Sequence, residues 1–118
     1  MISKILILLI ALLHVYILIL EMFLWQTPKG LKAFGNTPEK AQITKQLAQN
    51  MGLYNGFLAA GLLWAAIAPA ELHQSLAYFF LGCVLVAGVY GSITASRKII
   101  FIQAVPALIA IISVVLGY

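Results

Sequence analysis

The sequence predicts an all-α integral membrane protein in which four helices cross the bilayer as a bundle. Of its 118 residues, 64% are hydrophobic and only 8% are charged, whereas soluble domains are about 45–50% apolar and about 25% charged. A soluble domain of this length has too small an interior to bury that much apolar surface. The apolar residues also form four long runs, with the basic residues outside them. We therefore expect lipid to surround most of the chain.

The four apolar runs place the expected spans at about residues 5–24, 51–68, 75–95 and 99–116. Each approaches the roughly 20 residues that a helix needs to cross the hydrocarbon core. Helices are favoured over strands because the runs are continuous rather than alternating. We expect the first run to be retained, since it is longer than a signal-peptide core and no small-residue cleavage site follows it. Without a repeat or linker, residues 1–118 are predicted to form a single domain.

The basic residues predict the orientation of these spans. With four crossings, the loops at residues 25–50 and 96–98 share one side, and together they hold six of the seven basic residues. Loops rich in Lys and Arg are usually cytoplasmic, so we predict that both termini lie outside the cytoplasm. The same preference, together with anionic lipid headgroups, accounts for the net charge of +4. We therefore expect the lipid bilayer, and no nucleic acid, as a partner.

The long first loop, predicted to be cytoplasmic, has two local signals. The Pro-Lys-Gly sequence at residues 28–30 is typical of a turn. The Thr-Pro-Glu sequence at residues 37–39 is typical of a helix start, with an N-cap, a proline at the first position and an acidic first turn. We expect a helix that begins at Pro38 and continues into the second span, its first part forming an amphipathic cytoplasmic stem.

Small residues and one proline predict how the spans pack. A small residue recurs every four positions in two runs: Gly52, Gly56 and Ala60, then Ala87, Gly91 and Ala95. This spacing lets helices approach closely, either within one chain or between copies in a homo-oligomer. Pro106 lies inside the fourth run and cannot donate to the carbonyl of Ile102, so a kink is expected there.

Polar side chains inside the runs are the functional candidates, because they are costly in lipid. His14 and Glu21 lie two helical turns apart on one face of the first run, about 10 Å apart in depth. Glu21 is expected within one turn of the cytoplasmic interface and His14 near the bilayer centre. The other runs place further polar residues in the cytoplasmic half. The predicted pocket residues are Glu21, His14, Asn50, Tyr54, Asn55, Tyr90, Thr94 and Gln103.

These residues predict a polar pocket that faces the cytoplasm and binds or transports a small solute or a lipid-like molecule. In it, Glu21 titrates or pairs with a cation, and the asparagines orient the ligand. The alternative is a non-catalytic structural or partner-binding membrane protein, in which interhelical hydrogen bonds only hold the helices together. A third hypothesis is a small membrane enzyme that acts on a lipophilic substrate, with Glu21 or Tyr54 as the acid or base.

The sequence lacks the motifs on which several enzyme chemistries depend. The sequence contains no Walker loop, GxSxG, HExxH or CxxC motif, which argues against nucleotide hydrolysis, serine esterase chemistry, zinc proteolysis and dithiol exchange. Cys83 is the only cysteine and lies in an apolar run. We therefore expect no metal site and no cofactor.

Five segments together resemble a known family. They are HVYI at residues 14–17, EMFLW at 21–25, QNxGLYNGFLAAG at 49–61, AGxYG at 87–91 and QxxPA at 103–107. The chain resembles the small bacterial membrane proteins of domain of unknown function 1304, over nearly its whole length. This resemblance implies a four-span bundle in the bacterial cytoplasmic membrane, the plasma membrane. It brings no established activity.

Two other families offer looser comparisons. The small multidrug resistance transporters also have four spans and a membrane glutamate in the first helix, which is similar to Glu21; here the first loop is longer and the glutamate lies closer to the interface. The membrane-associated eicosanoid and glutathione metabolism enzymes resemble the chain in the long first loop. Gln46 and Tyr54 replace the charged residues of those enzymes, so glutathione binding is not expected.

Overall fold

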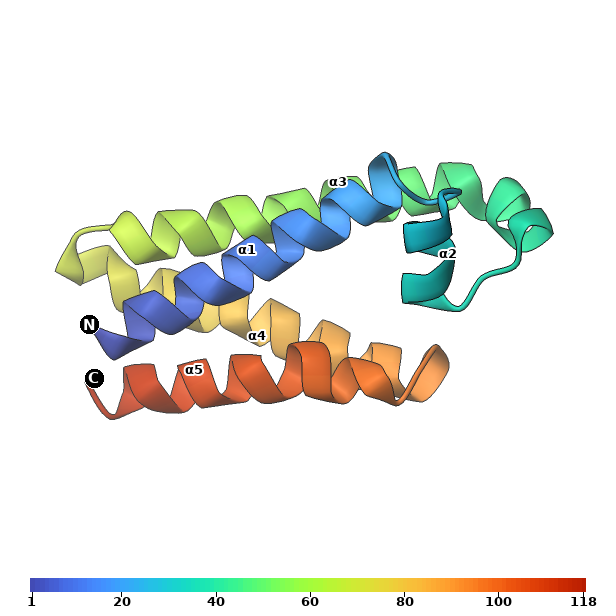
Figure 1. Ribbon diagram of the computed structural model, residues 1–118. Helices are drawn as coiled ribbons and strands as arrows, with labels where there is room; N and C mark the ends of the chain where they lie inside the picture. The colour runs from blue at the N-terminus through green and yellow to red at the C-terminus, as the bar shows by residue number, and fades with distance from the viewer. The chain divides into compact units, whose positions relative to one another are not determined.

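The computed structural model describes residues 1–118 and is all-α, as predicted (Figure 1). Five α-helices and one π-helical segment follow one another along the chain: α1 (Ile2–Met22), α2 (Pro28–Phe34), α3 (Pro38–Ile67), α4 (Ala70–Thr94), η1 (Ile100–Ala104) and α5 (Val105–Val115). Two of these helices, α1 and α4, are long and apolar enough to cross a membrane. Their length and composition suggest a membrane protein.

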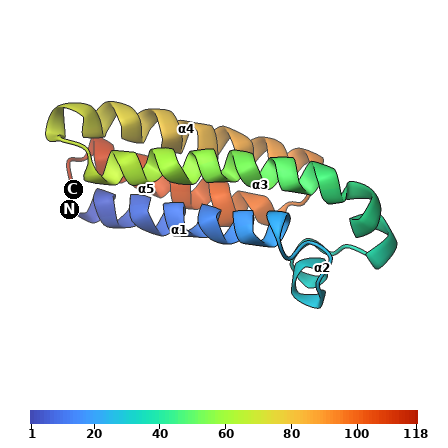
Figure 2. The same cartoon turned by 90° about the horizontal axis from the view of Figure 1, so that it is seen from above.

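The chain divides into two compact units. We call Met1–Leu12 together with Leu58–Tyr118 the core unit, and Leu13–Phe57 the hairpin unit. In the core unit, α4 and α5 run side by side (Figures 1 and 2). The two ends of the chain also meet here, because the amide of Ser3 donates to the carbonyl of Tyr118 at 3.2 Å.

Alanine makes up half of the interior of the core unit. Four helical segments contribute to it: Ile7, Ile10 and Ala11 from α1, Leu62, Ala65 and Ala66 from α3, Ala77, Leu81 and Val84 from α4, and Ala107, Ala110 and Val114 from α5. Many other large apolar side chains lie outside, as Phe79, Val86 and Ile93 of α4 show with 64%, 68% and 78% of their surface exposed. Soluble proteins show the opposite preference, with large apolar residues buried.

The hairpin unit contains a helix where a turn was expected. The prediction of a turn at residues 28–30 is wrong, because Pro28 begins α2. Thr27 is its N-cap, and its hydroxyl oxygen accepts a hydrogen bond from the amide of Gly30 at 3.3 Å. Gly35 ends the helix in the left-handed conformation, with φ of 64°. The Thr-Pro pair at residues 27–28 is thus the same helix start that was recognised at residues 37–38.

The expected long helix from Pro38 is confirmed. Thr37 caps it, since its hydroxyl accepts a hydrogen bond from the amide of Lys40 at 3.2 Å. The helix then continues for 30 residues to Ile67 without a break.

A kink at Pro106 stays a prediction; the structure has a π-helical segment, η1, just before this proline, which ends at Ala104 and is followed directly by α5. A proline cannot donate the backbone hydrogen bond of an α-helical turn, so the turn before it has to adjust. Gly88 of α4 lies against this segment. A Cβ atom added at Gly88 would lie 2.6 Å from the amide nitrogen of Ala104.

Candidate functional site

The hairpin unit brings two of the predicted pocket residues into direct contact. Glu21 lies in the last turn of α1, and only 2% of its surface is exposed. The side-chain amide of Asn55, in α3, donates a hydrogen bond to the Glu21 carboxyl at 2.5 Å. The same amide nitrogen also donates to the backbone carbonyl of Met51 at 3.1 Å. Asn55 is therefore anchored on its own helix and joins it to α1.

Two glycines of α3 explain why these side chains meet. A Cβ atom added at Gly52 would lie 2.5 Å from Cγ of Met22 and 3.2 Å from Cβ of Glu21. A Cβ atom added at Gly56 would lie 2.7 Å from a methyl group of Leu18. Part of the small-residue face predicted in the second run thus packs against α1 of the same chain. This close approach lets the short asparagine side chain reach the carboxyl.

The partner of the buried carboxyl is neutral. Asn55 is the hydrogen-bond donor to Glu21, and the lysines of this unit lie elsewhere. One of them, Lys29, places its ammonium group 5.3 Å from the centre of the Tyr16 ring. A buried carboxylate is stable only with hydrogen bonds and a compensating cation, or with a bound proton. The Glu21–Asn55 pair can therefore accept a cation or a proton.

Three other predicted residues of the hairpin unit take different positions. His14 is buried, with 1% of its surface exposed, two turns before Glu21 in α1. Asn50 is exposed, and its amide donates to the carbonyl of Gln46 in its own helix at 3.0 Å. Tyr54 has 63% of its surface exposed and meets Phe57 edge-on. The structure therefore connects neither Asn50 nor Tyr54 to Glu21 by a hydrogen bond.

The remaining predicted residues, Tyr90, Thr94 and Gln103, belong to the core unit. Tyr90 is exposed, and its carbonyl accepts a hydrogen bond from the hydroxyl of Thr94 at 2.8 Å. Gln103 is half-buried in η1. A pocket that these residues share with Glu21 stays a prediction.

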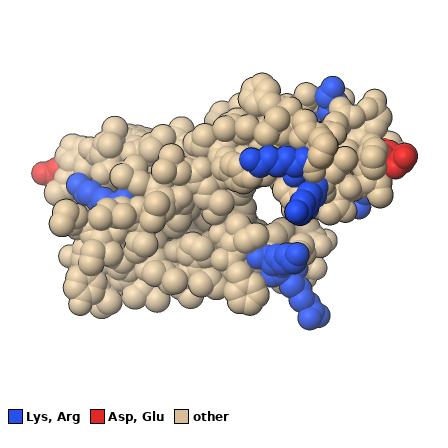
Figure 3. Space-filling view, in the orientation of Figure 1, with Lys and Arg blue, Asp and Glu red and all other residues tan.

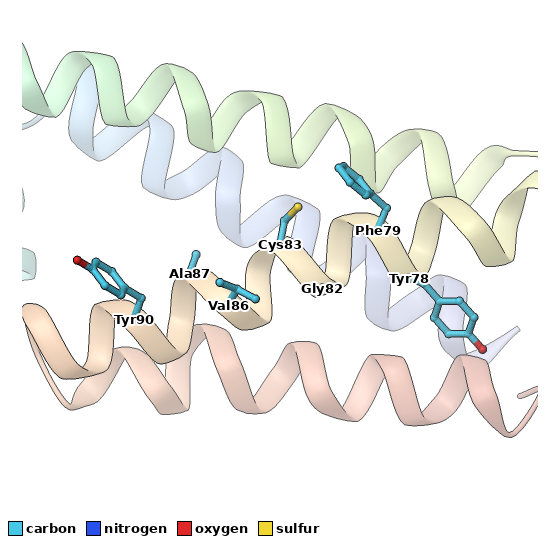
Figure 4. Close-up of a pocket in the computed structure, with 7 residues that line it drawn as sticks. All are labelled: Tyr78, Phe79, Gly82, Cys83, Val86, Ala87 and Tyr90. Atoms are coloured by element: carbon cyan, nitrogen blue, oxygen red, sulfur yellow. The ribbon is translucent and has the colours of Figure 1, made fainter.

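The core unit also carries an apolar groove along α4 (Figure 4). Its volume is about 620 Å³, and all of its lining residues come from this one helix: Tyr78, Phe79, Gly82, Cys83, Val86, Ala87 and Tyr90. Tyr90 is the one predicted pocket residue in its lining. The lining offers no carboxylate or imidazole for acid–base chemistry.

Contacts that sequence reasoning missed join the segment after α1 to the first turns of α3. The indole nitrogen of Trp25 donates to the hydroxyl of Thr44 at 3.2 Å, and the ring also packs against Phe34 at 4.8 Å. The side chains of Gln26 and Gln42 are hydrogen-bonded as well. In the sequence, Trp25 and the polar residues around it are the signal that could have indicated these contacts. No group of three or more His, Cys, Asp or Glu side chains could hold a metal ion.

Comparison with known proteins identifies the family. The family described as "Protein of unknown function (DUF1304)" matches residues 8–115. The chain belongs to the DUF1304 family. The matched stretch includes Glu21 and Asn55. This DUF1304 protein is 32% identical over 108 residues to "Uncharacterized protein YpaA" of Lactococcus lactis subsp. lactis (strain IL1403), with 90% of each chain covered. No solved structure matches the chain.

Proposed function

We propose that this DUF1304 protein crosses the bacterial cytoplasmic membrane four times and that Glu21 and Asn55 form a site within the membrane that binds and moves a small cationic solute. One observation carries the proposal: Glu21 has only 2% of its surface exposed, and its carboxyl is hydrogen-bonded to a neutral amide. An unpaired carboxylate in a medium of low dielectric constant favours binding of a cation or a proton. If the bound cation and a proton replace each other at Glu21, solute binding is coupled to proton movement.

Placement in a membrane is supported by the distribution of apolar side chains. In the core unit the interior is rich in alanine, while large residues such as Leu9 and Ile109 have 57% and 52% of their surface exposed. Figure 3 shows that uncharged atoms cover most of the visible surface. Exposed apolar surface of this extent is unfavourable in water but suits lipid.

Four crossings follow if α3 and the η1–α5 segment span the membrane together with α1 and α4. The segment Ile100–Val115 is apolar but shorter than α1 and α4. The 30 residues of α3 are more than long enough to cross. Under this topology the loops that hold six of the seven basic residues face the cytoplasm.

The experiment compares three identical chemical changes, because the chain has only three acidic residues. Glu21→Gln removes the charge at the site, while the controls Glu39→Gln and Glu71→Gln remove an exposed charge at the start of α3 and of α4. Binding of the lipophilic cation tetraphenylphosphonium to the purified full-length protein in detergent is measured by equilibrium dialysis. We expect Glu21→Gln to lower the affinity by about tenfold or more, and the controls to keep it.

A parallel thermal unfolding measurement separates binding from structure. We expect Glu21→Gln to unfold at nearly the same temperature as the wild type, since glutamine can still accept the hydrogen bond from Asn55. Equal cation affinity in all four proteins, or no binding by any of them, would contradict the cation site. A large loss of thermal stability confined to Glu21→Gln would instead favour the structural role.

A further inference from the structure

The hairpin unit also presents a surface that combines basic and apolar side chains. We define this basic surface as the four exposed lysines of α2 and of the first turns of α3, together with two exposed aliphatic residues: Lys29, Lys32, Lys40, Lys45, Ile43 and Leu47. Ile43 and Leu47 have 83% and 66% of their surface exposed. Lysine side chains stand out from this unit in Figure 3. None of these side chains belongs to the Glu21–Asn55 site.

The depth of this surface in a bilayer follows from Trp25. Tryptophan rings prefer the layer where lipid headgroups meet the hydrocarbon, and Trp25 lies just after the end of α1. Its indole nitrogen donates to the hydroxyl of Thr44 at 3.2 Å, so the neighbours of Thr44, Ile43 and Lys45, lie at a similar depth. The length of α3 agrees: 30 residues extend about 45 Å, against about 30 Å of hydrocarbon. Its first ten residues thus project into the headgroup layer.

The charge of this surface and its apolar side chains indicate which molecule it binds. Between residues 25 and 57 there are four lysines and a single acidic residue, Glu39. Basic side chains near a membrane attract anionic lipid headgroups. Apolar side chains next to them insert at the boundary between headgroups and acyl chains. Lys29 also contacts α1, with its ammonium group 5.3 Å from the centre of the Tyr16 ring.

We propose that the basic surface binds the headgroups of anionic phospholipids, so that anionic lipid is enriched around the hairpin unit. The inference rests on the membrane placement proposed above. Lysine ammonium groups would contact the lipid phosphates, while Ile43 and Leu47 would contact the upper part of the acyl chains.

The test uses Trp25 as a reporter of nearby lipid. Trp64→Phe removes the other tryptophan, which lies in α3 and is half exposed. The full-length Trp64→Phe protein is reconstituted in bilayers with equal fractions of brominated phosphatidylglycerol or brominated phosphatidylcholine, and bromine quenching of Trp25 fluorescence gives the local lipid composition. Anionic phosphatidylglycerol should be preferred by about fivefold or more, the effect of a single lysine near an anionic surface.

Two variants in this background assign the preference to the basic surface. Lys29→Gln/Lys32→Gln/Lys40→Gln/Lys45→Gln should abolish it. The control Lys4→Gln/Arg97→Gln/Lys98→Gln, which neutralises the other three basic residues, should keep it. In high salt the preference should weaken, because salt screens exposed charges.

Four other outcomes overturn the inference, and the last of them also overturns the membrane placement. Equal quenching by the two lipids, or a preference that survives in the four-lysine variant, would show that the basic surface does not select anionic lipid. Cross-linking is tested with Ile43→Cys in a Cys83→Ser background. If quenching by the two lipids is equal and Ile43→Cys cross-links two copies, the surface binds a second copy of the chain. Absence of quenching by either lipid would place Trp25 outside the bilayer and contradict the proposed spans as well.

Discussion

At the level of single residues, Asn50 and Asn55 show how much the direction of a side chain matters. Both are asparagines of α3, and both donate a hydrogen bond to the carbonyl four residues earlier. Asn55 also donates to the Glu21 carboxyl, whereas Asn50 is exposed and contacts only its own helix by hydrogen bonding. Comparing substitutions at the two residues therefore measures how much the hydrogen bond between α1 and α3 contributes to the free energy of unfolding.

We expect Asn55→Ala to lower the free energy of unfolding by about 1–2 kcal/mol, because it leaves the Glu21 carboxyl without its donor. Asn50→Ala should change it by less than about 0.5 kcal/mol, as is usual for exposed positions. Thermal unfolding of the purified variants in the same detergent measures both. Equal effects of the two substitutions would show that the bond between α1 and α3 does not stabilise the fold.

At the level of helices, close approach depends on individual glycines, and α4 contains two contrasting ones. At Gly88 an added Cβ atom would lie 2.6 Å from the backbone nitrogen of Ala104 and 3.0 Å from its Cα atom. At Gly82 an added Cβ atom would meet nothing within 4 Å. Of these two glycines, only Gly88 is therefore needed for α4 to pack against η1.

Gly88→Ala should destabilise the protein by about 1–3 kcal/mol, since a rigid backbone segment has to move. Gly82→Ala should be neutral or stabilising by up to about 1 kcal/mol, because alanine favours the helix and the added methyl group has free space. Chemical unfolding of both variants under one set of conditions measures the difference. If the two substitutions shift the unfolding midpoint alike, the contact between α4 and η1 does not limit packing.

For the whole molecule, the central question is the number of crossings and the side on which each loop lies. Two helices qualify as spans by length and composition, and the proposed topology adds α3 and the η1–α5 segment. Under that proposed topology, the lysine and arginine counts predict that the first and third loops lie in the cytoplasm.

Single cysteines introduced into a Cys83→Ser background test this topology in whole cells. Lys40→Cys and Lys98→Cys should react with a membrane-impermeant maleimide only after the cells are broken. His73→Cys, in the first turn of α4, should react in intact cells. A cysteine at position 40 and one at position 98 that label from opposite sides would contradict four crossings.

Much of the fold is predictable from local signals in the sequence. Runs of apolar residues predict the long helices, and the Thr-Pro-Glu sequence at residues 37–39 predicts where α3 begins. The helix α2 was missed although Thr27, Pro28 and Gly35 carry the same kind of capping signals. Seven residues are too few to bury an amphipathic face, so the helix depends on its caps and its contacts. The candidate site is predictable only in part. The sequence shows which polar residues lie in apolar helices, but it does not show which of them form hydrogen bonds with one another.

The sequence by itself determined the helical class, the apolar character of the helices, the family and the presence of Glu21 and Asn55 within apolar runs. These properties depend on residues close together in the chain. Only the tertiary structure decided that Asn55, and not Asn50 or Tyr54, meets Glu21. That choice depends on the rotation of α3 against α1 and on the close contact that Gly52 and Gly56 allow. Rotation and approach depend on packing between distant segments, which no local pattern specifies.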